Sequence, residues 1–273
     1  MIGAHLPIGK GIWTIQKQMD ILKIETCAIF LKNQRRFDFS HIEEKSVSKF
    51  KEEVKNPFTI VPHASYLINL ANPKMQDQSY NCLIDDMKRC NLLGIGFYNI
   101  HPGSDTSKLG NKRALEMIAE NLNKAIKEVP NVVVLLENMA GQGNVCGRTF
   151  EELKSIIDLI DDQSRIGVTL DTCHMFAGGY DIRSPELFEK IMLDFDRIIG
   201  MKYLKAVHLN DSKNEFNSRK DRHESIGKGQ IGIEAFRYIM NSKFFEDIPM
   251  VLETPEPKNY AKEIEILRGL IQD

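Results

Sequence analysis

Residues 165–174 read RIGVTLDTCH, a short apolar run that ends at an acidic residue and is followed by a histidine three positions later. A run of this length, apolar at nearly every position, is typical of a strand covered on both faces. Similar runs recur along the whole chain, at residues 2–6, 26–31, 58–62, 96–100, 132–136, 165–170, 203–207 and 249–252. Eight such runs predict a parallel sheet.

The segments between the runs carry helix signals. Thr149 and Glu152 form a capping box, and Ser184-Pro185 supplies an N-cap and a proline for the first helical position. Gly94 ends a third amphipathic stretch. The apolar stripe of the helix after Ser184 is predicted to consist of Leu187, Ile191, Phe195 and Ile198.

Strands that alternate with helices predict a right-handed parallel α/β fold. The chain has 273 residues, which suits a (β/α)₈ barrel of about 250 residues. No glycine-rich dinucleotide-binding turn follows the first run, which disfavours a doubly wound sheet. We therefore predict a single TIM-barrel domain over residues 1–273, with two long and functional connections at 32–57 and 211–232.

The composition is that of an ordinary globular protein, with 42% hydrophobic and 27% charged residues. No apolar run approaches the roughly 18 residues of a membrane span, and the N-terminus does not resemble a signal peptide. The five cysteines are odd in number and form no C-x-x-C pair. They predict reduced thiols and an intracellular protein, cytoplasmic (in the nucleoid) or nuclear, that is not secreted.

Six of the eight runs are followed directly by a histidine or an acid. These residues are His63, His101, Glu137, Asp171, His208 and Glu253. All strands of a barrel direct their carboxyl ends to one face, so the six side chains are expected to converge. Crowded imidazoles and carboxylates destabilise one another unless a cation lies between them. Mixed ligands of this kind suit Zn²⁺, with Mn²⁺ or Fe²⁺ as alternatives.

Three further residues extend this set: His174 lies three positions after Asp171, and Asp221 and His223 lie in the second long connection. Nine donors are too many for one ion and suit two or three ions, particularly if a carboxylate bridges. Each residue also has an ordinary interpretation, since Glu137 suits an ion pair and Asp171 suits a helix cap.

Three other residues are less favoured as members of the cluster. His5 ends the first run and is expected to support the site or to face the substrate, whereas His41 is expected at the surface. Cys173 is a less favoured thiolate ligand, because better placed oxygen and nitrogen donors surround it.

The sequence resembles the endonuclease IV family of apurinic/apyrimidinic (AP) endonucleases. The matching stretches are GAH at 3–5, KNQRR at 32–36, PHASYLINL at 62–70, HPGS at 101–104, LENMAGQG at 136–143, LDTCHMFAGGYD at 170–181, HLNDSK at 208–213, SRKDRHESIGKG at 218–229 and LETP at 252–255. They span nearly the whole chain in order. The most specific are LDTCH with GYD, HLND, and DRH followed by GKG.

The resemblance implies a TIM barrel that holds three zinc ions per chain, with Mn²⁺ as an alternative metal. One zinc would be held by His63, His101 and Glu137; a second by Glu137, Asp171, His208 and Glu253; and a third by His174, Asp221 and His223. The implied reaction is hydrolysis of the phosphodiester 5′ to an abasic site in double-stranded DNA, as in base excision repair. Glu137 and Glu253 would be the catalytic carboxylates, and 3′-blocking groups would also be removed.

The resemblance also implies that Arg35 and Tyr66 contact DNA. Chemistry on an abasic nucleotide requires it to leave the stack, and a flat guanidinium or aromatic ring can fill the opened space. Other basic residues on the two long connections are expected to surround the metals: Lys32, Arg36, Arg219, Lys220, Arg222 and Lys228. The formal charge of −2 argues mildly against a polyanionic partner, but three Zn²⁺ would raise it to about +4.

Two other functions remain open from the sequence. A sugar isomerase or epimerase of the xylose isomerase type shares the barrel and the His/Glu/Asp metal site, but usually needs fewer ligands. The second alternative function is a DNA-binding module that metal stabilises and that has no catalytic activity. We expect the protein to be a monomer. Its expected partner is DNA and not a membrane.

Overall fold

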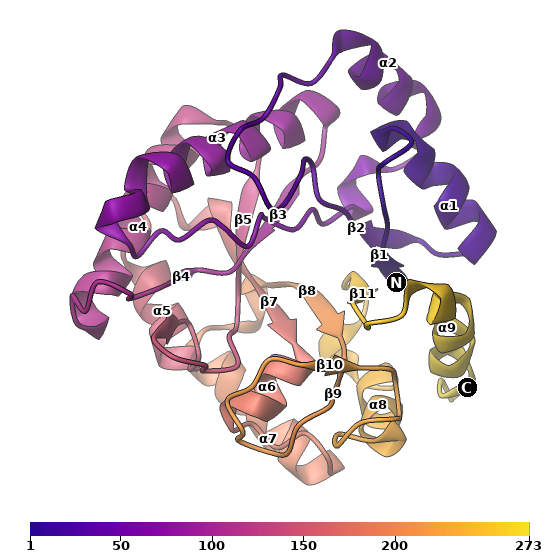
Figure 1. Ribbon diagram of the computed structural model, residues 1–273. Coiled ribbons are helices and arrows are strands. Elements are labelled where there is room, and N and C mark those ends of the chain that lie inside the picture. The colour runs from indigo at the N-terminus through magenta and orange to yellow at the C-terminus, as the bar shows by residue number, and fades with distance from the viewer. Residues whose placement is uncertain (273) are drawn as a thin grey trace.

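The computed structural model describes residues 1–272, and a curled sheet of parallel strands ringed by helices forms its centre (Figure 1). The seven strands of this sheet follow the order β2-β1-β11-β8-β7-β5-β3, and every neighbouring pair is parallel. They are β1 (Ile2–His5), β2 (Thr26–Ala28), β3 (Phe97–Ile100), β5 (Val133–Glu137), β7 (Ile166–Asp171), β8 (Leu204–Leu209) and β11 (Met250–Leu252). Seven of the eight predicted runs are therefore strands of one sheet.

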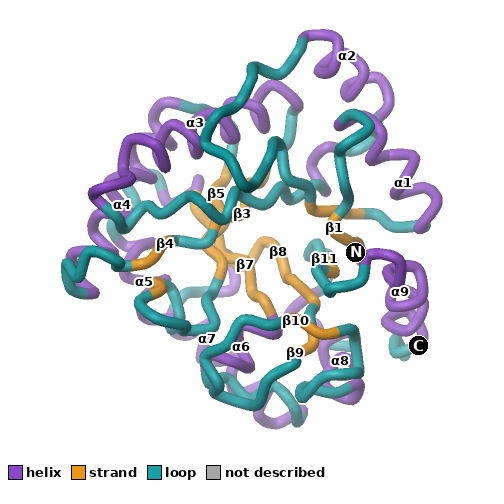
Figure 2. The backbone as a smooth tube through the Cα atoms, in the orientation of Figure 1, coloured by secondary structure: helices purple, strands orange, loops and turns teal. Residues whose placement is uncertain are grey.

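Helices connect these strands and cover the outside of the sheet, as the purple and orange segments of Figure 2 show. The helices are α1 (Ile15–Leu22), α2 (Glu44–Glu53), α3 (Gln76–Leu93), α4 (Asn111–Glu128), α5 (Phe150–Asp158), α6 (Thr172–Gly178), α7 (Pro185–Ile198), α8 (Ile233–Met240) and α9 (Tyr260–Gly269). Four short strands form two antiparallel pairs in the connections: β4 (Gly103–Ser104) with β6 (Val145–Cys146), and β9 (Asp211–Ser212) with β10 (His223–Glu224). Among the helices of residues 1–272, none is long and apolar enough to cross a bilayer.

The third predicted strand, 58–62, is only partly formed. Its first residues lie in a 3₁₀ turn, Pro57–Thr59, that the side chain of Asn56 caps by accepting a hydrogen bond from the Phe58 N–H at 3.1 Å. Proline at the first position of the turn and at residue 62 removes two N–H donors from any ladder. The rest of the run still pairs in parallel with both neighbours, Ile60 with Cys27 and His63 with Asn99. It therefore fills the gap between β2 and β3 and closes the barrel.

The helix signals were mostly right. Ser184 accepts a hydrogen bond from the Leu187 N–H and caps α7, and Gly94 takes a left-handed conformation at the end of α3. The predicted stripe of α7 was right for Phe195, and Ile191 and Ile198 pack half-buried against the core. It was wrong for Leu187, which is 42% exposed, and it missed Phe188 and Met192, which are buried. Apolar residues occupy two adjacent rows of this helix, so the pattern alone did not determine which row faces the core.

Alternation along the strands determines which side chains enter the barrel. Leu135 of β5 and Ala206 of β8 form a small buried cluster with Val61, apart from the large cluster packed under the helices, to which Leu136 and Val207 belong. Successive side chains of a strand point to opposite faces, so residues two positions after these inner residues also point inward. These are Glu137, His208 and His63.

Gly3 lies where the neighbouring strand leaves no room for a side chain. A Cβ atom at this position would lie 1.9 Å from the Thr26 carbonyl oxygen of the neighbouring strand β2. We predict that Gly3→Ala lowers the free energy of unfolding by about 1–3 kcal/mol or more, since backbone atoms would have to separate. Gly9→Ala is the matched control, because no atom lies within 4 Å of its added Cβ. Equal denaturant midpoints for the two variants would contradict this account of the barrel.

Candidate metal centre

The structure brings all nine predicted ligand residues to the carboxyl ends of the strands. Seven of them line one cavity of about 360 Å³, together with Tyr66 and Gln142: they are His63, His101, Glu137, His174, Asp221, His223 and Glu253. The other two, Asp171 and His208, are fully buried directly beside it. The donor atoms fall into overlapping groups that could each hold a metal ion.

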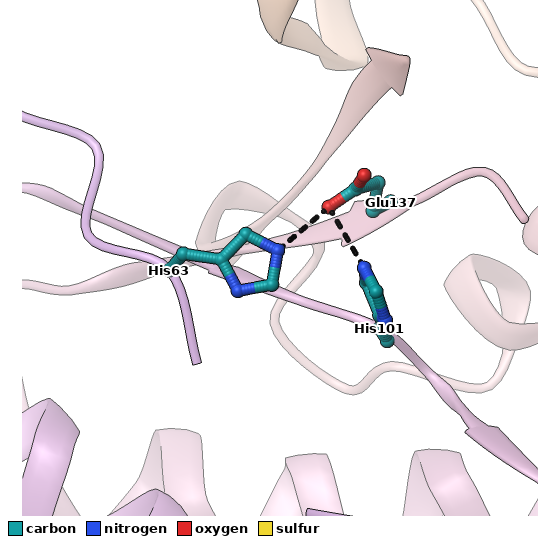
Figure 3. A group of neighbouring side chains, drawn as sticks. All are labelled: His63, His101 and Glu137. Carbon is teal, nitrogen blue, oxygen red and sulfur yellow. Dashed lines mark ion pairs between the residues drawn. The ribbon is translucent and has the colours of Figure 1, made fainter. Parts of the chain in front are cut away.

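The first group consists of His63, His101 and Glu137, which Figure 3 shows with both imidazoles directed at one carboxylate oxygen. The Nε2 atoms of His63 and His101 lie 3.3 and 3.5 Å from Oε2 of Glu137. Each side chain comes from a different strand end, and Glu137 is fully buried at the end of β5. Two imidazole nitrogens and a carboxylate oxygen on one side of a cavity suit a tetrahedral ion with one open position.

The second group gathers three carboxylates around His208. Its Nδ1 atom lies 3.2 Å from Oε1 of Glu137, 3.3 Å from Oε2 of Glu253 and 4.0 Å from Oδ2 of Asp171. Glu137 therefore presents one oxygen to the first group and the other to the second. This is the arrangement that a bridging carboxylate requires.

The third group is assembled by the connection that follows β8. Strands β9 and β10 pair there, and the hairpin brings Asp221 and His223 over α6. Asp221 lies 3.1 Å from Nε2 of His174 and 3.3 Å from Nε2 of His223, and His223 also lies 3.6 Å from Asp171. Asp171 thus contacts the third group as well as the second.

Asp171 has two functions that the sequence offered as alternatives. Its Oδ1 atom accepts a hydrogen bond from the His174 N–H at 2.7 Å and caps α6. Its Oδ2 atom faces the cluster and accepts a hydrogen bond from Asn210 at 2.6 Å. The cap fixes the start of the helix that carries His174, so one carboxylate both joins the cluster and positions a neighbour.

Three of the histidines share an orientation that leaves a ring nitrogen free for a ligand. Nδ1 of His63 bonds the Ala64 carbonyl at 2.8 Å, Nδ1 of His174 bonds the Asn138 carbonyl at 2.9 Å, and Nδ1 of His223 bonds the Glu253 carbonyl at 3.0 Å. A carbonyl only accepts, so Nδ1 carries the hydrogen in each case. The Nε2 atoms then face the carboxylates, and those of His174 and His223 are buried without a hydrogen-bond partner among the described residues. Histidines that ligate metals are characteristically held in this way.

The electrostatic field of the cavity favours cations strongly. Burial lowers the pKa of His208, but the carboxylates of Glu253 and Glu137 outweigh burial and raise it to about 9. Burial also opposes ionisation of Glu137, yet the charges of His208 and His101 hold its pKa well below the usual value. Protons on the imidazoles therefore balance the carboxylates when no metal is bound, and a metal ion must displace them.

Several residues that hold the carboxylates were missed from the sequence. Asn99 donates a hydrogen bond to Oε2 of Glu137 at 2.6 Å. Asn210 donates to Oδ2 of Asp171, and its Oδ1 atom accepts a hydrogen bond from the backbone N–H of Glu253 at 2.9 Å. Both asparagines are fully buried, two positions from a cluster histidine in the sequence. Residues two positions apart on a strand face the same side, so this spacing was the signal in the sequence that both asparagines point into the barrel. His5, as expected, supports the site and bonds Oε1 of Glu253 through Nδ1 at 2.9 Å.

The remaining candidates divide between the cavity and its rim. Tyr66 lines the cavity with a 58% exposed side chain, and its ring centroid lies 5.3 Å from that of His63. Arg35 is exposed on the loop that follows β2, and His41 is exposed as predicted. Cys173 lies beside Asp221 and His223, but burial raises the pKa of its thiol to about 12, so it is the weaker ligand.

Lys32 was wrongly predicted as a cation on the rim of the metal site. Its side chain is 7% exposed and is paired with Asp85 and Asp86 of α3. The other basic residues of the two connections are exposed as expected: Arg36, Arg219, Lys220, Arg222 and Lys228.

Comparison with known proteins agrees with this geometry. The family model described as xylose isomerase-like TIM barrel matches residues 21–270. Apurinic-apyrimidinic endonuclease 1 of Plasmodium berghei is 46% identical over 97% of this chain, which spans only 54% of that relative's length. Probable endonuclease 4 of Chlorobium phaeovibrioides is 44% identical over 98% of this chain and 99% of its own length.

A solved structure agrees with both the sequence relatives and the fold. The crystal structure of endonuclease IV from Thermus thermophilus superposes with a TM-score of 0.86 at 32% identity, covering 98% of each chain. The barrel predicted from the sequence is thereby confirmed. The chain belongs to the endonuclease IV family of AP endonucleases, within the broader group of xylose isomerase-like TIM barrels.

Proposed function

We propose that the protein is a zinc-dependent DNA repair endonuclease that hydrolyses the phosphodiester 5′ to an abasic site, leaving a 3′-OH and a 5′-deoxyribose phosphate. Removal of 3′-blocking groups would use the same cavity. The observation that supports this most is the set of histidines whose Nδ1 atoms are bonded to carbonyls and whose Nε2 atoms face buried carboxylates. Double-stranded DNA is the proposed partner, and the acting form is a monomer inside the cell.

The proposed ligand sets follow the three groups of donors. They are His63, His101 and Glu137; Glu137, Asp171, His208 and Glu253; and His174, Asp221 and His223. The first two sets are compact groups of donor atoms, and in the third Asp221 contacts two histidines that also group with Asp171. Bound zinc would lower the pKa of a water molecule towards 7 and neutralise charge on the phosphate, and Mn²⁺ is the alternative metal. The orphaned Nε2 atoms and the mixture of nitrogen and oxygen donors fit such ions.

Glu137 and Glu253 are the proposed catalytic carboxylates. Asn99 fixes Glu137 so that its two oxygens face different groups, His63 and His101 on one side and His208 on the other. Glu253 lines the cavity, and its Oε2 atom, which lies 3.3 Å from Nδ1 of His208, is the oxygen proposed to orient the attacking water and accept its proton. His5 holds the other Glu253 oxygen and so prevents the carboxylate from turning away.

Tyr66 and Arg35 are proposed to contact the DNA around the lesion. The Tyr66 ring stands over the cavity beside His63 and His101 and is largely free on its other side. Ser65 ties this segment to the Arg35 loop by donating to the Gln34 carbonyl at 2.7 Å. The two flat side chains are therefore available to stack where the abasic nucleotide leaves the duplex.

The reaction is tested with a duplex that carries one abasic site in an end-labelled strand. We expect incision with many turnovers per chain, a product that a polymerase can extend, and loss of activity after chelation of metals. Glu253→Gln should lower kcat more than about tenfold, because it removes the charge proposed to orient the water. Ketose–aldose interconversion without incision would instead support a sugar isomerase, and binding without turnover would support a non-catalytic DNA-binding module.

The stacking residues are tested by comparing two substrates. Arg35→Ala and Tyr66→Ala should each slow incision of the abasic duplex about tenfold or more, since one lost stacking contact is worth roughly 1–3 kcal/mol. A small chromogenic phosphodiester needs no nucleotide flipping, so its cleavage and the zinc content should stay within about twofold of wild type. Equal losses on both substrates would mean that these residues support the metal site instead.

A further inference from the structure

The loop that carries Arg35 is fastened to one face of helix α3, outside the metal centre. Residues Cys82, Asp85, Asp86 and Arg89 recur at helical spacing on that face, and each contacts the loop or a group bonded to it. In Figure 1 this loop runs from β2 to α2 in front of the barrel. None of these residues of α3 lines the metal-site cavity.

Lys32 forms the first attachment, at the start of the loop. Its ammonium lies 2.8 Å from Oδ2 of Asp85, 3.2 Å from Oδ1 of Asp86 and 3.0 Å from the Cys82 carbonyl oxygen. Tyr98 of β3 donates its hydroxyl to the other oxygen of Asp86 at 2.7 Å and fixes that carboxylate. The base of the loop is thereby joined to both a helix and a barrel strand.

Arg89 forms the second attachment, at the end of the loop. Its Nε atom donates to Oδ2 of Asp85 at 2.7 Å, and its NH2 group donates to the Ser40 carbonyl. The same oxygen of Asp85 therefore accepts from Lys32 and from Arg89. A single carboxylate joins the two ends of the loop.

Between these attachments the loop presents its cations to solvent. Arg35 and Arg36 are exposed, and a third contact holds the loop in register with the cavity, since Ser65, next to Tyr66, donates to the Gln34 carbonyl. The side chains that could bind DNA are exposed, while the backbone that carries them is fixed. A binding group that is already positioned loses less conformational freedom when the partner arrives.

The network contains two cations and two anions, and all four side chains are at most 14% exposed. Buried ion pairs contribute little net stability compared with apolar packing of the same volume, and their best-attested use is to fix a particular arrangement. Here the arrangement that is fixed is the position of the Arg35 loop over the cavity.

We propose that Arg89 and Asp85 are positioning residues that act on DNA through Arg35. This inference rests on the proposed function, because it assumes that Arg35 contacts the duplex. It assigns a role in substrate binding to residues of α3 that contact neither the metal ligands nor the cavity.

The test is a double-mutant cycle on incision of the abasic duplex. Arg89→Met keeps an unbranched side chain about as long as the aliphatic part of arginine and leaves Lys32 paired with Asp85, but removes the bonds of Arg89 to Asp85 and to Ser40. We expect KM to rise about three- to tenfold while kcat, zinc content and cleavage of the small phosphodiester stay within about twofold. Adding Arg89→Met to Arg35→Ala should cause little further loss, since both changes remove one function.

Two further variants separate positioning from folding and from charge. Arg89→Lys keeps the charge but cannot reach both Asp85 and the Ser40 carbonyl, so it should keep only part of the affinity for the duplex. If Arg89→Met does not fold, the KM of Arg89→Lys tests the inference instead. Arg113→Met removes an equal charge from α4, where Arg113 pairs with Glu120, and should not change KM. The inference would be overturned if the increases in KM caused by Arg35→Ala and Arg89→Met multiplied in the double variant. It would also be overturned if Arg89→Met left KM unchanged. An unchanged duplex KM in Arg35→Ala would instead overturn the proposed DNA contact.

Discussion

The arrangement of the site depends on the contacts between the buried carboxylate of Glu137 and the surrounding imidazoles. The carboxylate is fully buried at the end of β5, and its two oxygens face imidazoles from strand ends on both sides of β5. A buried carboxylate is stable only if opposite charge surrounds it. Protonated His63 and His208, whose pKa values are lowered by burial but raised more by the neighbouring carboxylates, supply that charge, and metal ions would supply it more effectively from the same positions. The first two donor groups both depend on this one buried charge, because Glu137 belongs to each of them.

The barrel explains how residues so far apart in the sequence meet at this carboxylate. Inner-facing positions alternate along each strand, and the position after an apolar run continues the inward register at the open end. Asp171 serves two purposes at once, because it caps the helix that carries His174 while its second oxygen joins the cluster. The hairpin of β9 and β10 then adds Asp221 and His223 from a loop that no strand register could place.

Much of this was predictable because strand ends and residue types are visible in the sequence. Six of the ligand candidates could be named from their positions at strand ends. Their asparagine supports could not, since only the bonds to Glu137 and Asp171 distinguish these residues from other asparagines. Lys32 was misjudged because a basic residue in a long loop usually faces solvent, and its acidic partners lie more than fifty positions away on α3. Two predictions were wrong for local reasons. Prolines interrupt the third strand, and two apolar rows on α7 hid the exposure of Leu187.

The central claim is that the converging side chains form a site for three metal ions. Crystals of the protein grown with zinc and measured at the zinc absorption edge test it most directly. Three anomalous peaks are expected, one in each donor group, with Glu137 between two of them and ligand distances of about 2.0–2.3 Å. A single peak, or none, in crystals of protein that is fully active on an abasic duplex would contradict the account.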